Sequence, residues 1–300
     1  MGKEETGNTG QIGVLKTLTH EILLTKAAES DREGVLELYL DEDASQDKII
    51  EYARRETAIG RWWLWEYWEQ KGLPKEQVEL TDGEHTINLY NYREEPVPEQ
   101  QLEQIKRILQ IFSGIRGGIA FNAVKYILLD DVQGMNDKSG DLTNGYGPVN
   151  SYAVTLYPNA LRAIPNRVTD KVTNLEGTIT HELTHGIPEM ILDGEMFLNN
   201  WVKVTGWEIA EERRKLPGGA TSIWETDSSR CVTDYATSDP DEDICESMVA
   251  YLFDPEKLDP EKLRLLQTAL PFDLSKESHW SSKHIKDIQI PETPQELNKA

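Results

Sequence analysis

The middle of the chain alternates between strand-like and helix-like spacing of its hydrophobic residues. Segments 85–92 (HTINLYNY) and 151–158 (SYAVTLYP) alternate apolar and polar positions, which predicts half-buried β-strands. Segment 124–131 (VKYILLDD) is a short apolar run between polar residues and predicts a buried strand. The polar, glycine-rich segment 130–148 predicts a loop. Segment 98–112 predicts an amphipathic helix. Its apolar face carries Leu102, Ile105, Ile108, Leu109 and Phe112.

The first part of the chain has a different pattern. Residues 1–13 are polar and predict a flexible tail, whereas residues 14–80 predict a helical N-terminal segment rich in good helix formers. The sequence KGLP at 71–74 supplies a glycine and a proline that end the helical pattern. Residues 81–300 combine strand and helix patterns, which predicts an α+β domain.

The tryptophan-rich stretch 61–70 (RWWLWEYWEQ) repeats its aromatic residues at helical spacing. Such a stripe is typical of a buried helix face, so we expect it to dock the N-terminal segment onto the α+β domain. The alternative is an autoinhibitory or targeting module.

A further helix is predicted around the sequence TITHELTHGI at residues 178–187. Thr173 and Glu176 stand three residues apart, as in a capping box that begins a helix. Gly186 and Pro188 are stop signals that end this helix directly after His185. Another helix is predicted at 241–252, beyond Pro240.

The helix at 178–187 carries a candidate metal motif. His181 and His185 are four residues apart, so both side chains lie on one helix face, as two zinc ligands must. Glu182 stands beside the first histidine, where a carboxylate can take a proton from a zinc-activated water. The sequence at His20 also reads Thr-His-Glu, but Leu24 replaces the second histidine, so a surface or interface role is expected there.

A catalytic zinc site needs a third protein ligand. The acidic residues Glu242 and Glu246 are four apart on the predicted helix, so one can bind the metal while the other orients a ligand histidine. The alternative is that this acidic cluster only favours a helix N-terminus. His279 and His284 belong to no spaced motif.

Together these motifs resemble the gluzincin zinc metallopeptidases, in which a glutamate-bearing helix follows H-E-x-x-H by some 55 to 60 residues. The segment DYATSDPDEDICES is similar, more narrowly, to the catalytic domain of anthrax lethal factor and its relatives, including the Pro-Pro endopeptidases. In that family a tyrosine stands seven residues before the glutamate, as Tyr235 stands before Glu242. The resemblance implies His181, His185 and Glu242 as zinc ligands, Glu182 as general base, Tyr235 as oxyanion-stabilising hydroxyl, and Glu246 as the carboxylate that orients a ligand histidine.

The resemblance therefore implies a zincin-like fold and a zinc-dependent endopeptidase that hydrolyses a peptide or protein substrate. The strand at 151–158 is expected to be the sheet edge along which an extended peptide binds, with an interior strand as the alternative. Two other functions remain open. One is a catalytically inactive zincin scaffold that binds a protein, and the other is a zinc hydrolase acting on a non-peptide substrate.

Composition and charge narrow the range of expected binding partners and cellular locations. The formal net charge of −22 disfavours nucleic acid and anionic membrane surfaces. No apolar run is long enough for a membrane helix and no secretory signal begins the chain, so we expect a cytoplasmic protein or one exported without a classical signal peptide. Two cysteines, Cys231 and Cys245, fit a reducing compartment, and the sequence leaves open whether they are bridged. Cys245 is expected to be a packed thiol, with a thiolate that competes for zinc as the alternative.

Overall fold

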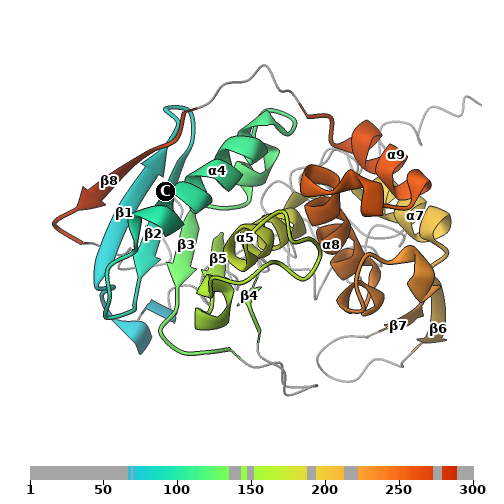
Figure 1. Cartoon of the computed structure of the whole chain (residues 1–300), viewed down its shortest axis with the longest axis horizontal. Coiled ribbons are helices and arrows are strands. Elements are labelled where there is room, and N and C mark those ends of the chain that lie inside the picture. Colours follow the sequence, from blue (N-terminus) through green and yellow to red (C-terminus); the bar gives the residue numbers. More distant parts are fainter. Residues whose placement is uncertain are drawn as a thin grey trace, which may run out of the picture.

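A six-stranded mixed sheet organises the protein (Figure 1). The computed structural model describes residues 67–68, 70–134, 143–146, 152–187, 194–212, 222–272 and 279–288. The strand order is β4-β5-β3-β2-β1-β8. The strands are β1 (Glu76–Thr81), β2 (Thr86–Asn91), β3 (Tyr126–Leu129), β4 (Gly145–Tyr146), β5 (Ala153–Leu156) and β8 (Ser281–Ile285).

The centre of the sheet is parallel and its margins are antiparallel. Strands β2, β3 and β5 run parallel, while β1 pairs antiparallel with β2 and β8, and β4 pairs antiparallel with β5. Parallel neighbours need a long crossover, and α4 (Glu99–Gly114) supplies the one between β2 and β3. A separate hairpin joins β6 (Glu208–Glu212) to β7 (Ser222–Glu225).

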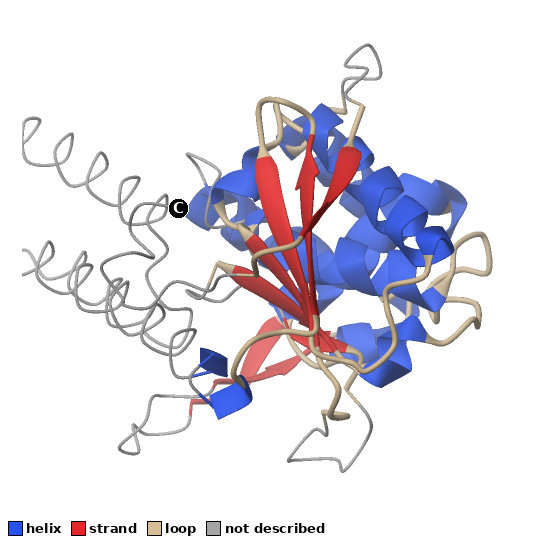
Figure 2. Cartoon of the chain, turned by 90° about the vertical axis from the view of Figure 1, so that its left-hand side faces the viewer, coloured by secondary structure: helices blue, strands red, loops and turns tan. Residues whose placement is uncertain are grey.

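The described long helices gather on one side of the sheet (Figure 2). They are α4, α5 (Asn174–His185), α7 (Gly194–Thr205), α8 (Pro240–Phe253) and α9 (Pro260–Ala269). Short 3-10 turns are η2 (Ile119–Asn122), η3 (Pro158–Leu161), η4 (Ser228–Arg230), η5 (Tyr235–Thr237) and η6 (Pro255–Lys257). Alternate strand residues such as Leu89, Ile127 and Val154 join the helices in one hydrophobic core. The α+β class predicted from the sequence is confirmed.

The opposite face of the sheet carries an aromatic cluster. Trp68 is fully buried and packs edge-to-face against Tyr90 and Tyr126, with ring centroids 5.8 and 5.2 Å apart. The predicted docking of the tryptophan-rich stretch is therefore confirmed at Trp68. Residues 61–66 of that stretch lie outside the described residues, as do residues 1–13 and His20.

Most of the elements predicted for the middle of the chain are confirmed. The predicted helices and strands coincide with α4, α5, α8, β2, β3 and β5, and all five residues of the predicted α4 face are buried. A helix ends at Lys71 and is followed by Gly72 at φ +71°, as the sequence KGLP predicts. The range 14–80 was wrong as a purely helical segment, because Glu76–Thr81 form β1 and pair within the sheet.

The edge-strand prediction was wrong. Strand β5, in the segment 151–158, lies inside the sheet between β3 and β4, and all four of its residues are buried. The edge is instead β4, a two-residue strand inside the segment predicted to be a loop.

Among the described residues, the helices are too short or too polar to cross a lipid bilayer.

Candidate metal centre

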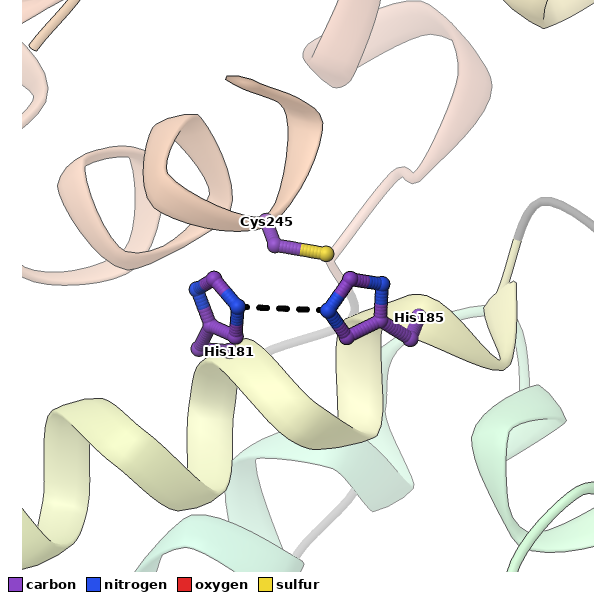
Figure 3. A group of neighbouring side chains, drawn as sticks. All are labelled: His181, His185 and Cys245. Carbon is purple, nitrogen blue, oxygen red and sulfur yellow. Dashed lines mark hydrogen bonds between the residues drawn. The ribbon is translucent and has the colours of Figure 1, made fainter. Parts of the chain in front are cut away.

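Helix α5 presents the two motif histidines from its last turns. The predicted capping box is present, since Thr173 accepts a hydrogen bond from the Glu176 N–H and the Glu176 carboxylate accepts one from the Thr173 N–H. Gly186 is the C-cap, so His181 and His185 both lie within the helix, one turn apart. The two rings lie edge-to-face, with centroids 4.9 Å apart (Figure 3). The helix therefore brings two imidazoles to one point, as its spacing predicted.

Helix α8 packs against α5 and adds a carboxylate to this pair. The Nε2 atoms of His181 and His185 are 3.2 Å apart. The Oε2 atom of Glu242 lies 3.0 Å from the first Nε2 and 3.8 Å from the second. Tetrahedral zinc with bonds of about 2.0 to 2.1 Å places its ligand atoms about 3.3 Å apart. The three predicted ligand atoms therefore have the mutual spacing of a zinc site.

Hydrogen bonding gives a second indication that these atoms suit a cation. In the described part of the chain, Glu242 Oε2 is buried without a hydrogen-bond partner, as is His185 Nδ1. The 3.0 Å approach to His181 Nε2 brings the carboxylate oxygen close without the alignment of a hydrogen bond. A buried carboxylate oxygen left unsatisfied is costly. A metal ion between the imidazoles would satisfy it, so the residues fit zinc.

Glu246 occupies the predicted position behind His181. Its Oε1 atom is 2.9 Å from His181 Nδ1, which leaves Nε2 directed toward Glu242 and His185. Thr233 Oγ1 donates to Glu246 Oε2 at 2.9 Å. Such a carboxylate fixes the tautomer and the ring orientation of a ligand histidine.

Glu182 lies buried beside the histidines, with 6% of its surface exposed. Burial raises the pKa of this carboxyl, while the neighbouring His181 and His185 oppose the rise. The edge strand β4 passes directly over it, since a Cβ added to Gly145 would lie only 2.6 Å from Glu182 Oε1. A carboxylate with a raised pKa next to a metal position is suited to accept a proton.

Tyr235 projects from η5 at the margin of the site. It is 36% exposed, and its hydroxyl donates to Glu242 Oε1 at 3.1 Å. Its ring centroid is 6.0 Å from that of His181. Burial and the charge of Glu242 raise the pKa of the phenol, so it keeps its proton at neutral pH. The structure thus brings together every site residue predicted from the sequence.

The charges of the cluster are strongly coupled. Burial opposes the ionisation of Glu242 and Glu246, but the neighbouring His181 outweighs it and holds the pKa of each carboxyl at about 2. Burial would lower the pKa of His181, yet its close contacts with the Glu242 and Glu246 carboxylates raise it to about 10. Without a metal this imidazole holds a proton, which a bound cation would replace.

Cys245 is a further donor near the site, for which the sequence favours a packed thiol over a zinc-binding thiolate. Its sulfur lies next to the histidine pair, and one ligand atom from each of the three residues falls within 4.8 Å of the others (Figure 3). The thiol is buried, as predicted. No disulfide joins Cys231 to Cys245.

Two residues that contact the candidate site could not be recognised from the sequence. Arg167 binds Glu246 across 79 positions of the chain, and Gly145 lies against Glu182 from a glycine-rich segment. Neither belongs to a spaced motif, and only the tertiary fold brings them to the helices.

Searches against protein-family models, curated proteins and solved structures find no match for this chain. What the site can do must therefore be argued from its own residues and geometry.

Proposed function

We propose that this chain is a zinc-dependent endopeptidase of the gluzincin type, with a zincin-like catalytic domain. The observation that carries the proposal is the convergence of His181 Nε2, His185 Nε2 and Glu242 Oε2 at zinc-ligand spacing. Glu182 and Tyr235 flank that point with a base and a hydrogen-bond donor. A structural site would need neither.

Each residue has a distinct task in peptide hydrolysis. Zinc bound by the three ligands would lower the pKa of a coordinated water toward about 7 and polarise the substrate carbonyl. Glu182 would accept a proton from the attacking water and pass it to the leaving amine. The Tyr235 phenol would donate a hydrogen bond to the oxyanion that develops on the carbonyl oxygen. Glu246 keeps the His181 imidazole in its ligand orientation.

The position of β4 supports a peptide substrate. This strand is outermost in the described sheet, and its Gly145 contacts Glu182 while its Tyr146 is 48% exposed. An extended peptide adding to this edge by main-chain hydrogen bonds would pass the base. The role first expected of residues 151–158 thus falls to β4.

The test combines metal analysis with activity. The wild type should bind one zinc per chain and cleave members of a peptide library, whereas Glu182→Gln should bind zinc and lose cleavage. A Glu182→Gln variant that still cleaves at the wild-type rate would refute the proposal. Glu242→Ala should lose zinc affinity; full occupancy and activity in this variant would move the third ligand to Glu246 or Cys245.

A second candidate function follows from Cys245. If its thiolate joined His181, His185 and Glu242, four protein ligands would close a tetrahedral structural site. The chain would then be an inactive scaffold that binds a partner protein. Cys245→Ser separates the two functions, because it should leave zinc affinity unchanged in the peptidase and weaken it strongly in the closed site.

A further inference from the structure

Arg167 joins two parts of the site that are separate in the chain. It lies in the segment before α5, and its Nε and Nη2 atoms donate to both oxygens of Glu246 at 2.7 to 3.1 Å. The same guanidinium stacks on the Tyr235 ring, with its central carbon 3.9 Å from the ring centroid. One planar group therefore contacts both the carboxylate behind His181 and the candidate oxyanion donor.

These contacts lead to the metal position by two routes. Through Glu246, Arg167 fixes the acceptor of His181 Nδ1. Through the ring of Tyr235, it fixes the phenol that reaches Glu242. We propose that Arg167 is a positioning residue that holds the His181 imidazole and the Tyr235 hydroxyl in register with each other. The inference rests on the peptidase function proposed above for the role of Tyr235.

The chemistry of the side chain suits this task. A guanidinium can bind a carboxylate through two parallel N–H groups while its flat face stacks on an aromatic ring. A lysine ammonium is a point charge and cannot make both contacts in one geometry. Tyr235 needs such support because it sits on a 3-10 turn and is 36% exposed.

The segment that carries Arg167 is itself fixed on α5. A Cβ added to Gly177 would lie 2.1 Å from Asn166 Nδ2, so the Asn166 side chain packs directly on the helix backbone. Asn166 Oδ1 also accepts the Val168 N–H at 2.9 Å. Arg167 lies between these two residues in the chain, so its backbone has a fixed position on α5. This limits where the guanidinium can lie, although the side chain is 40% exposed.

The chain offers a matched control in Arg107. This arginine also pairs with a buried glutamate, donating to Glu176 at 2.8 Å, and lies 6.0 Å from the ring of Phe253. Its side chain is 57% exposed and it contacts the opposite end of α5. Arg107→Met therefore removes a comparable ion pair between a partly exposed arginine and a buried glutamate without touching the metal site.

The first measurement is zinc affinity by competition with a chromophoric chelator, which needs no enzymatic activity. Arg167→Met should weaken zinc binding by about 10- to 100-fold, as loss of a group that orients a ligand does. Arg167→Lys should also be weakened, whereas Arg107→Met should match the wild type. Wild-type affinity in Arg167→Met, or full recovery in Arg167→Lys, would overturn the inference.

The second measurement is a double-mutant cycle with Tyr235→Phe at saturating zinc. Arg167→Met should lower kcat by about 10-fold or more with little change in KM, and should cost at least about threefold less in the Tyr235→Phe background. An equal loss in both backgrounds, or a rise in KM alone, contradicts positioning through Tyr235. If the zinc-loaded wild type cleaves no peptide, the proposed function fails, while the zinc measurement still decides whether Arg167 positions the site.

Discussion

Substituting Lys262 tests how the helix that carries Glu242 is held in place. Lys262 of α9 and Asp243 of α8 form an ion pair in which neither side chain is exposed, with Nζ 2.5 Å from Oδ1. The other carboxylate oxygen accepts the indole N–H groups of Trp201 and Trp207 at 3.0 and 3.1 Å. Asp243 directly follows Glu242, so this pair anchors the residue next to a candidate zinc ligand.

The cost of Lys262→Met follows from what remains after the change. Methionine preserves most of the apolar stem, so little cavity is created. Asp243 keeps two neutral N–H donors but loses its only contacting cation among the described residues. Leaving one charge of a buried pair uncompensated destabilises by about 3 to 5 kcal/mol. For a domain of this size that corresponds to a melting point lower by roughly 6 to 20 °C.

Urea unfolding followed by tryptophan fluorescence measures this loss, and Arg264→Met is its control. Arg264 is an exposed cation on the same helix, so its substitution should change stability by less than about 0.5 kcal/mol. Lys262→Met combined with Asp243→Asn removes both charges and should cost less than the sum of the two single changes. If Lys262→Met unfolds at the same urea concentration as Arg264→Met, the buried pair does not stabilise the contact between α8 and α9.

Three further predictions address the start of α5, the strand β4 and a thiol. Thr173→Ala removes the cap that binds the Glu176 N–H and should lower the free energy of unfolding by about 1 kcal/mol in a denaturant titration. Gly145→Ala places a methyl group against Glu182 and should lower kcat while leaving zinc affinity unchanged, as metal analysis and peptide kinetics would show. Burial raises the pKa of Cys231 to about 11, so little of this thiol is ionised at pH 8. Its alkylation at pH 8 should therefore be roughly 20-fold slower than that of a small-molecule thiol. The rate, followed by mass spectrometry, should increase as the pH rises toward 11.

The candidate site was largely predictable because its key residues obey helical spacing. His181 and His185 share a face of α5, and Glu242 and Glu246 share a face of α8. Spacing alone cannot say that two helices some 60 residues apart in the chain will meet. That step came from the resemblance of the motifs, and the contact between His181 and Glu246 agrees with it.

The spacing of hydrophobic residues could not predict the sheet edge or the residues that support the candidate site. Two residues, Gly145 and Tyr146, cannot display an alternation, so β4 had no periodic signal. Without such a signal, β5 is the last recognisable strand before the motif helix, and the sequence therefore predicts β5 as the edge. Arg167 acts through tertiary contacts alone, and an exposed arginine in an irregular segment has no sequence signature.

The charge of the buried cluster gives a further reason to propose a bound dication. Glu182, Glu242 and Glu246 bring three carboxylates together, while Arg167 supplies one positive charge and a protonated His181 a second. When Glu182 is also ionised, as its proposed role as a general base requires, one negative charge stays unbalanced in this buried cluster, where charges are weakly screened. Exchanging the imidazole proton for a doubly charged ion balances the cluster. The overall charge of −22 gives no such argument, because surface charges are solvated. With Glu182 ionised, the buried excess of negative charge favours the doubly charged ion that we propose.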